Sequence, residues 1–308
     1  MNYFMSGASL LALSLAGAAS AQELSYGGFS ASMGNYTAGP TDVDTTVFSG
    51  NVGVQVQDFD FWISGTNATL DIGLPVDLSA DALTFGAGYS FNDFRVDVSN
   101  TDLDLSIGPL GIGGGITEIG FAYDNGTYFG RLGYGQVDED FLGDVSTTGL
   151  LVGYRLTERA EVALSIHNID EPSSTLDKPI YILSANYDGG QWGVELDALN
   201  ADLGIAKVSV TSLGANYDIN DTWSIYGNYA QADLDILEAT SMRLGGAYNT
   251  GAYTIFADYS ISEIDGAPDD LRGVTFGFTM DFGSKPTSHE TTADRLGGVL
   301  GSIAGYQF

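Results

Sequence analysis

The sequence predicts an all-β fold, a transmembrane antiparallel β-barrel of about sixteen strands. Three observations lead to this prediction. Apolar and polar residues alternate along nearly the whole chain after Gln22, whereas helical periodicity is almost absent. The alternating runs come in pairs around tight turns. Aromatic residues stand beside those turns on the apolar side, as is typical of strands that leave a membrane there.

The composition excludes several other classes of protein. The chain has 308 residues, of which 40 are acidic and 10 basic, so its formal net charge is −30. This charge argues against tight binding of nucleic acid, because phosphate contacts need a basic patch. The absence of cysteine excludes disulfide scaffolds, thiolate metal sites and cysteine nucleophiles. No run of about 20 apolar residues follows the N-terminus, which excludes a bundle of membrane-spanning helices.

Residues 1–21 have the features of a secretory signal peptide. An apolar stretch over residues 10–18 precedes Ala19-Ser20-Ala21, a small-x-small cleavage pattern. The segment departs from the usual pattern because its start carries no Lys or Arg, and the alternative is a buried N-terminal helix. We expect residues 22–283 to form the barrel and residues 284–308 to form a C-terminal tail.

The strands are expected wherever the side chains alternate with a period of two residues. In the clearest run, apolar residues at every second position from Val274 to Phe282 alternate with polar residues and glycine. In one run the apolar parity shifts between Val98 and Leu103, which indicates either a bulge or a strand that has left the buried zone. The expected strands span approximately 24–36, 46–58, 61–72, 83–91, 94–106, 115–124, 127–137, 147–156, 160–169, 178–187, 191–199, 208–217, 222–232, 241–249, 252–262 and 272–282.

The connections between these runs are expected to alternate in length. Asn, Asp and Gly supply the short turns, since they tolerate the positive φ that tight hairpins need. Longer polar loops of roughly seven to ten residues are expected between them, and the third, Ile107 to Gly114, is short and Gly-rich. Short periplasmic turns with longer extracellular loops are the arrangement of outer-membrane barrels. The short turns lie near Asn92-Asp93, Asp124-Asn125-Gly126, Thr157-Glu158-Arg159, Asp188-Gly189-Gly190, Asp218 to Asp221 and Asn249-Thr250-Gly251.

Aromatic residues mark one end of the predicted barrel. Rings with an apolar body and a polar tip prefer the boundary between membrane and water. A soluble β-sandwich or solenoid is the alternative, but it must cover about sixteen apolar faces in a dry core, whereas lipid covers them without a second layer. The aromatic residues beside the turns are Phe91, Phe94, Tyr123, Tyr128, Tyr154, Tyr187, Trp192, Tyr217, Trp223, Tyr248 and Tyr253.

The last strand resembles that of bacterial outer-membrane porins. Thr275, Gly277, Met280 and Phe282 match the C-terminal assembly signal of that class, which the barrel-insertion machinery reads. The whole chain resembles sixteen-stranded general porins of α-proteobacterial type. The resemblance implies the outer membrane of a Gram-negative bacterium, a homotrimer, and contact with outer-membrane lipid and lipopolysaccharide. It departs from the family in the short third loop and in the residues that follow the signal strand.

The tail after the signal strand has three possible roles. It is a periplasmic extension, a short helix from about Thr292 to Ile303, or a plug in the lumen. The sequence leaves these alternatives open.

The parity opposite to the turn-flanking aromatics is expected to face the barrel interior. Charged side chains belong on that face, because each costs a few kcal/mol in lipid. A lining of this kind sorts solutes by charge, although salt bridges that stiffen a filled barrel are the alternative. The predicted pore-lining residues are Arg95, Asp97, Glu118, Arg131, Arg155, Glu161, His167, Glu195, Asp197, Arg243, Asp258 and Asp281.

Most of the remaining acidic residues fall in the predicted loops. Examples are Asp138 to Asp140, Asp170-Glu171 and Asp269-Asp270. Such carboxylates can bind Ca²⁺ or Mg²⁺ weakly, but none has EF-hand spacing, and a solvated rim that attracts cations is favoured. No cofactor motif is present in the sequence.

An enzyme is not expected. The two histidines, His167 and His289, lie in no recognisable nucleophile motif, although Ser165 is close to His167. The sequence therefore predicts an outer-membrane porin for passive diffusion of small hydrophilic solutes with a cation preference. The alternatives are a non-conducting structural or surface-interaction barrel with a plugged lumen, and a secreted β-solenoid or adhesin.

Overall fold

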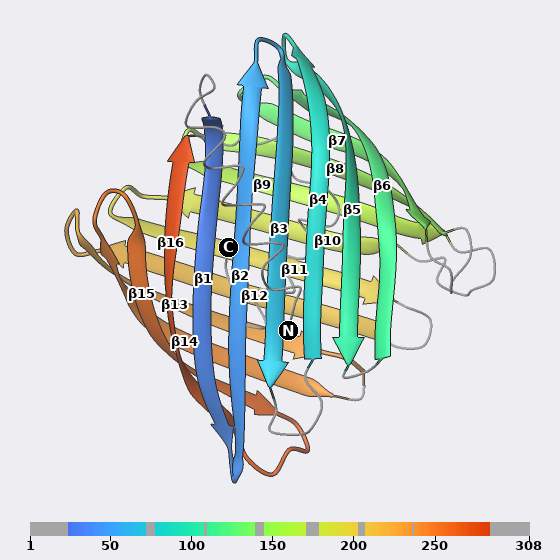
Figure 1. The fold of residues 1–308 in the computed structure, drawn as a ribbon. Helices are drawn as coiled ribbons and strands as arrows, with labels where there is room; N and C mark the ends of the chain where they lie inside the picture. The colour runs from blue at the N-terminus through green and yellow to red at the C-terminus, as the bar shows by residue number, and fades with distance from the viewer. Residues whose placement is uncertain are drawn as a thin grey trace.

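The computed structural model is a closed barrel of sixteen antiparallel strands (Figure 1). It describes residues 24–71, 78–107, 110–138, 145–170, 179–202, 207–235 and 237–283. The predicted fold class and strand count are therefore confirmed. The predicted signal peptide (1–21) and tail (284–308) lie outside the described residues. Within the described ranges, no helix is long and apolar enough to cross a membrane.

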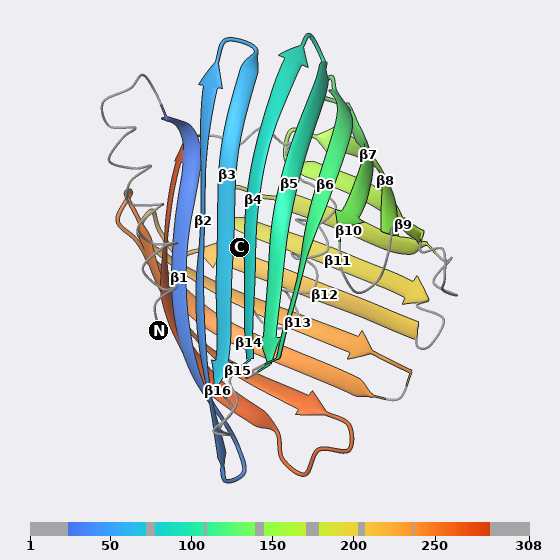
Figure 2. The same cartoon turned by 45° about the vertical axis from the view of Figure 1, so that its right-hand side comes forward.

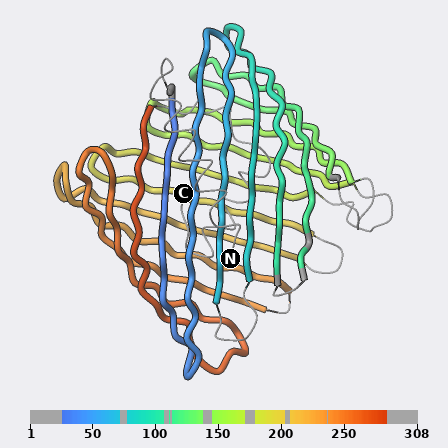
Figure 3. The backbone as a smooth tube through the Cα atoms, in the orientation of Figure 1, coloured from blue at the N-terminus to red at the C-terminus, as the bar shows by residue number. Residues whose placement is uncertain are grey.

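The chain runs up and down through successive hairpins, which can be followed in the backbone tube of Figure 3. The barrel closes because β1 pairs with both β2 and β16. Figures 1 and 2 show the steep strands β1–β6 crossing the strands β10–β14 of the opposite wall, as the strand tilt of a closed barrel requires. The strands are β1 (Leu24–Ala38), β2 (Thr41–Val56), β3 (Phe59–Asp71), β4 (Leu78–Phe91), β5 (Phe94–Ile107), β6 (Leu110–Asp124), β7 (Tyr128–Asp138), β8 (Val145–Thr157), β9 (Ala160–Asp170), β10 (Ile180–Asp188), β11 (Trp192–Asp202), β12 (Lys207–Asp218), β13 (Trp223–Asp233), β14 (Glu238–Asn249), β15 (Thr254–Ile264) and β16 (Leu271–Gly283).

The two faces of the wall differ in chemistry. On β5, Val96 and Val98 are exposed while Arg95 and Asp97 between them are buried, and the same alternation recurs around the barrel. A closed sheet has only an outer and an inner face, so the exposed aliphatic and aromatic set is the outer, lipid-facing one. The other set, called here the inner face, lines the barrel interior.

The shift of apolar parity in β5 is not a bulge. Its pairing with β4 runs without a register shift from Leu78 opposite Ile107 to Phe91 opposite Phe94. Leu103 therefore stays on the inner face and is exposed. The second alternative, a strand that has left the buried zone, describes this end of β5.

The loop lengths differ from those predicted. Two residues separate Ala38 from Thr41, and two separate Ile107 from Leu110, so the expected loop from Ile107 to Gly114 is wrong. The Gly-rich residues 111–115 continue β6, because pairing with β5 satisfies their backbone groups. Nine residues separate Asp170 from Ile180, which is within the predicted range of seven to ten. The two connections of two residues are shorter than that range.

The aromatic residues at the turn end form a belt of touching rings. Phe94 lies 5.0 Å from Tyr123 on the next strand, and Trp223 lies 4.8 Å from Tyr248 in the same way, measured between ring centroids. Asn92, with φ of 52°, provides the tight turn between Phe91 and Phe94. The belt therefore links neighbouring hairpins as well as the two strands of one hairpin.

One glycine allows a large inner side chain to lie flat against the wall. Gly86 faces Trp62 across β3 and β4, and a Cβ at position 86 would overlap the indole ring. Gly65, also in β3, has its nearest atoms at 3.5 and 3.6 Å from such a Cβ, which is ordinary contact.

Replacing Gly86 with alanine should therefore destabilise the barrel by about 1–3 kcal/mol, the usual effect of overpacking. Gly65→Ala is the matched control and should leave the stability nearly unchanged. The free energy of unfolding in urea, with the barrel in detergent micelles, measures both. Equal stability of the two variants would contradict the close approach of Trp62 to the wall.

Candidate functional site

All twelve residues predicted to line the interior lie on the inner face, by strand parity and pairing. Seven are buried, two are exposed and the others are intermediate. The buried ones are Arg95, Asp97, Glu118, Arg131, His167, Asp197 and Asp258, and the exposed ones are Glu195 and Asp281.

Two arginines form a continuous ion-pair ladder across β3, β5, β6 and β7. Arg95 donates two hydrogen bonds to Asp60, at 2.5 and 2.8 Å, and its guanidinium lies 5.3 Å from the Trp62 ring centroid. Arg131 donates to Asp97 and to Glu118, both at 2.6 Å. Nε of Arg95 lies 3.5 Å from Asp97, which joins the two halves. Bidentate guanidinium contacts of this kind fix geometry as well as charge.

A second cluster surrounds Arg155 near the turn end of β8. Arg155 donates to both oxygens of Asp124, at 2.7 and 2.9 Å, and its Nε lies 3.5 Å from Glu161. Asn186 of β10 donates to Glu161 at 3.1 Å. The guanidinium also lies over the Phe129 ring, 4.7 Å from its centroid. Four strands are thus tied together on the inner face.

A third cluster is built on β13 to β15. Nε of Arg243 lies 3.4 Å from Asp258, and the Tyr226 hydroxyl donates to the same carboxylate at 3.0 Å. The pairing that closes the barrel lies beside it, where the hydroxyls of Tyr36 and Thr275 are 2.9 Å apart. Thr275 directly faces Asp258 on the neighbouring strand.

The structure adds residues that the sequence prediction missed. Asp60, Asp124 and Tyr226 are direct partners of predicted residues. Each has inner parity. Asp60 lies one residue before the expected strand 61–72, whereas Asp124 and Tyr226 lie within the expected strands 115–124 and 222–232, where parity alone would have assigned them to the inner face. Of the predicted residues, Glu195, Asp197 and Asp281 belong to none of the three arginine clusters.

The inner face carries more negative than positive charge. The four arginines are outnumbered by nine carboxylates named above on the same face, and each arginine is already within 3.5 Å of at least one of them. The carboxylates on this face therefore exceed the arginines by five.

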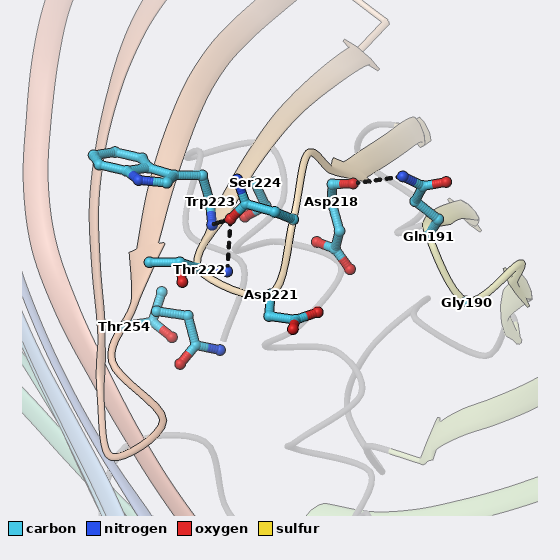
Figure 4. Close-up of a pocket in the computed structure, with 10 residues that line it drawn as sticks. Gly190, Gln191, Asp218, Asp221, Thr222, Trp223, Ser224 and Thr254 are labelled. Atoms are coloured by element: carbon cyan, nitrogen blue, oxygen red, sulfur yellow. Dashed lines mark hydrogen bonds between the residues drawn. The ribbon is translucent and has the colours of Figure 1, made fainter.

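A polar cavity of about 420 Å³ lies at the turn end, outside these clusters. Figure 4 shows Gln191 reaching from one turn toward the next, where it donates to the main-chain oxygen of Asp218 at 3.2 Å. The main-chain N–H groups of Thr222 and Trp223 donate to Asn220, both at 2.9 Å. These bonds fix the shape of the turns.

Among the described residues, no group of three or more His, Asp or Glu is placed to hold a metal ion.

Breaking the buried ladder should cost more stability than breaking an exposed pair. Asp97→Asn removes the charge that joins Arg95 to Arg131, and we expect a loss of about 3 kcal/mol, the lower end for a buried pair, since Glu118 still neutralises Arg131. Asp270→Asn, which breaks the exposed pair with Arg272, is the control and should change little. Urea unfolding in detergent measures both. A similar effect of the two substitutions would contradict a buried ladder.

Solved structures with the same fold include two that are named porins. The anion-selective porin of Comamonas acidovorans is 14% identical, with a TM-score of 0.57 over 83% of this chain and 98% of that one. A triple mutant of the Rhodopseudomonas blastica porin is 14% identical, with a TM-score of 0.53 over 84% and 99%. OccAB4 of Acinetobacter baumannii is 7% identical, with a TM-score of 0.53 over 83% and 97%. No curated protein matches the chain in sequence.

The sequence itself matches a family model. The model described as Gram-negative porin covers residues 79–237, which is 159 of the 308 residues. This stretch runs from β4 to the connection after β13 and includes the ladder residues from Arg95 to Arg131. The chain therefore belongs to the family of Gram-negative porins, the channel-forming barrels of the outer membrane.

Proposed function

We propose that this porin passes small hydrophilic solutes by passive diffusion and prefers cations. The observation that carries the proposal is the surplus of carboxylates on the inner face, where each arginine is within ion-pair distance of an acid. An excess of carboxylates over arginines along a narrow aqueous path raises the local concentration of cations. The fold itself does not decide the sign of the preference, since one porin of the same fold is named anion-selective.

The proposal gives the buried histidine no catalytic role. His167 and Ser165 lie side by side on the inner face of β9, opposite Ile180 and Ile182 of β10. Both are buried, with Ser165 at 1% exposure. A structural role is therefore favoured over a reaction with a solute.

The partners that we propose follow from the outer face. Phe276 and Phe278 of β16 are exposed there. We propose that the barrel-insertion machinery reads the assembly signal of Thr275, Gly277, Met280 and Phe282 on this strand, in which Met280 and Phe282 share the outer parity and Thr275 and Gly277 have the inner one. Lipopolysaccharide would surround the apolar wall, and weak binding of Ca²⁺ or Mg²⁺ to rim carboxylates would reduce their repulsion. A homotrimer is the proposed assembly.

The central test is conductance in a planar lipid bilayer. With a KCl gradient across the bilayer, the reversal potential should give a permeability for K⁺ above that for Cl⁻. An impermeable barrel, or one that prefers Cl⁻, would overturn the proposal.

A charge on the inner face should set this preference, and a charge on the outer face should not. Glu195→Gln should lower the ratio of K⁺ to Cl⁻ permeability about twofold, or ~0.4 kcal/mol, somewhat below the ~1 kcal/mol between unit charges 4 Å apart in water. Glu263→Gln is the control, because Glu263 is exposed with outer parity on β15. The reversal potential measures both variants. An equal effect at the two positions would assign the preference to the net charge of the protein.

A further inference from the structure

The polar cavity at the turn end of the barrel takes no part in the arginine clusters. It is the cavity of about 420 Å³ in Figure 4, called here the turn-end cavity. Its volume is within the usual range of sites for small molecules. The described residues that line it carry carboxylate, amide and hydroxyl groups, and none of them is basic.

The turn-end cavity lies on the inner side of the wall. Ser224, which lines it, alternates along β13 with Trp223 and Ile225, whose side chains are exposed on the outer face. Thr254, on the other side of the cavity, alternates in the same way with the exposed Ile255 of β15. The cavity is therefore part of the mouth of the barrel interior at its turn end.

Hydrogen bonds between three successive turns hold the cavity in shape. Gln191 and Asp218 exchange two bonds, since the main-chain N–H of Asp218 donates to the carbonyl of Gln191 at 2.8 Å and the Gln191 side chain donates back at 3.2 Å. The main-chain N–H of Asn249 donates to the carbonyl of Thr222 at 2.7 Å. The cavity is thus formed before any solute arrives, which lowers the cost of binding.

Two asparagines supply hydrogen-bond donors to the cavity. The side-chain oxygen of Asn220 accepts from the main-chain N–H groups of Thr222 and Trp223, and that of Asn249 accepts from Gly251 at 2.7 Å. Both asparagines line the cavity. Because main-chain N–H groups hold the two oxygens, each amide presents its NH₂ group, which only donates.

Two carboxylates supply the acceptors. Asp218 and Asp221 line the cavity, and in Figure 4 the Trp223 ring points away from both of them. The hydroxyls of Ser224 and Thr254 can both donate and accept. Donors and acceptors therefore stand side by side on one rigid frame.

This combination selects among solutes by chemistry. The carboxylates repel an anion, and an apolar solute would leave the polar groups without partners. An ammonium ion would use the acceptors and leave the amide donors unused. A hydroxyl group uses both, because it donates to a carboxylate and accepts from an amide.

We propose that the turn-end cavity binds neutral sugars as they pass the mouth of the pore. The inference rests on the proposed pore function and names a class of substrate for it. Sugar hydroxyls donate to Asp218 and Asp221 and accept from the amides of Asn220 and Asn249. The cavity is open, so binding is weak, and weak binding suits a solute that must also leave the site.

Saturation-transfer NMR tests binding to the full-length barrel in a detergent that has no sugar headgroup. Glucose should bind in the millimolar range. Gluconate, which adds a negative charge to the same chain of hydroxyls, should bind more weakly, and methylammonium chloride should not displace glucose. Displacement by methylammonium would make the cavity a cation site and overturn the proposal, as would the absence of glucose binding.

Variants locate the binding in the cavity. Asp221→Ala should raise the dissociation constant of glucose about tenfold, the usual effect of losing one hydrogen bond to a charged group. Thr254→Val keeps the side-chain shape and should raise it about fivefold, as for a neutral hydrogen bond. Glu158→Ala is the control, because Glu158 is exposed in a neighbouring turn outside the cavity lining, and should leave the constant unchanged. Equal weakening by Asp221→Ala and Glu158→Ala would overturn the proposal.

Conductance separates the sugar site from the pore function. In a planar bilayer, glucose should lower the K⁺ current through the natural barrel by a larger fraction than through Asp221→Ala. An equal fractional decrease would place the site outside the conducting path and overturn the proposal. If the barrel conducts but glucose does not bind, the sugar site is wrong and the pore function stands. If glucose binds to a barrel that does not conduct, the site stands and the pore function fails.

Discussion

The backbone hydrogen bond is the constraint on which the rest of this structure depends. A strand inside lipid has no water for its N–H and C=O groups, so each must find a partner on a neighbouring strand. An open sheet would leave two edges unpaired. Pairing of β1 with β16 over residues 26–37 and 272–283 removes both edges. The chain needs no disulfide for this closure, and it contains no cysteine.

Closure also determines where charge can lie. Once the wall is complete, every side chain points either to lipid or to the interior, and the paired strands fix the choice for each residue. Burial of the arginines then requires partners, because an unpaired buried charge is costly. The ladder from Asp60 through Arg95, Asp97 and Arg131 to Glu118 satisfies this need across several strands. The same pairing leaves more carboxylates than arginines on the inner face.

The inner face is therefore divided by chemistry. Charged clusters occupy β3–β9 and β13–β15, whereas aliphatic side chains cover the loop end of β9–β13. A uniformly polar wall would suit an open pore. The buried aliphatic side chains make this part of the inner face apolar.

The alternation of side chains determined the fold class, the number of strands and the face of each charged residue, because a two-residue period is a local property of an extended chain. It did not determine loop lengths, since the Gly-rich residues 111–115 extend β6 only through pairing with β5. Nor did it identify the partners of each arginine. Asp60 and Arg95 are 35 residues apart, and only the register of the closed barrel brings them together. Contacts between distant strands depend on that register, which no local pattern contains.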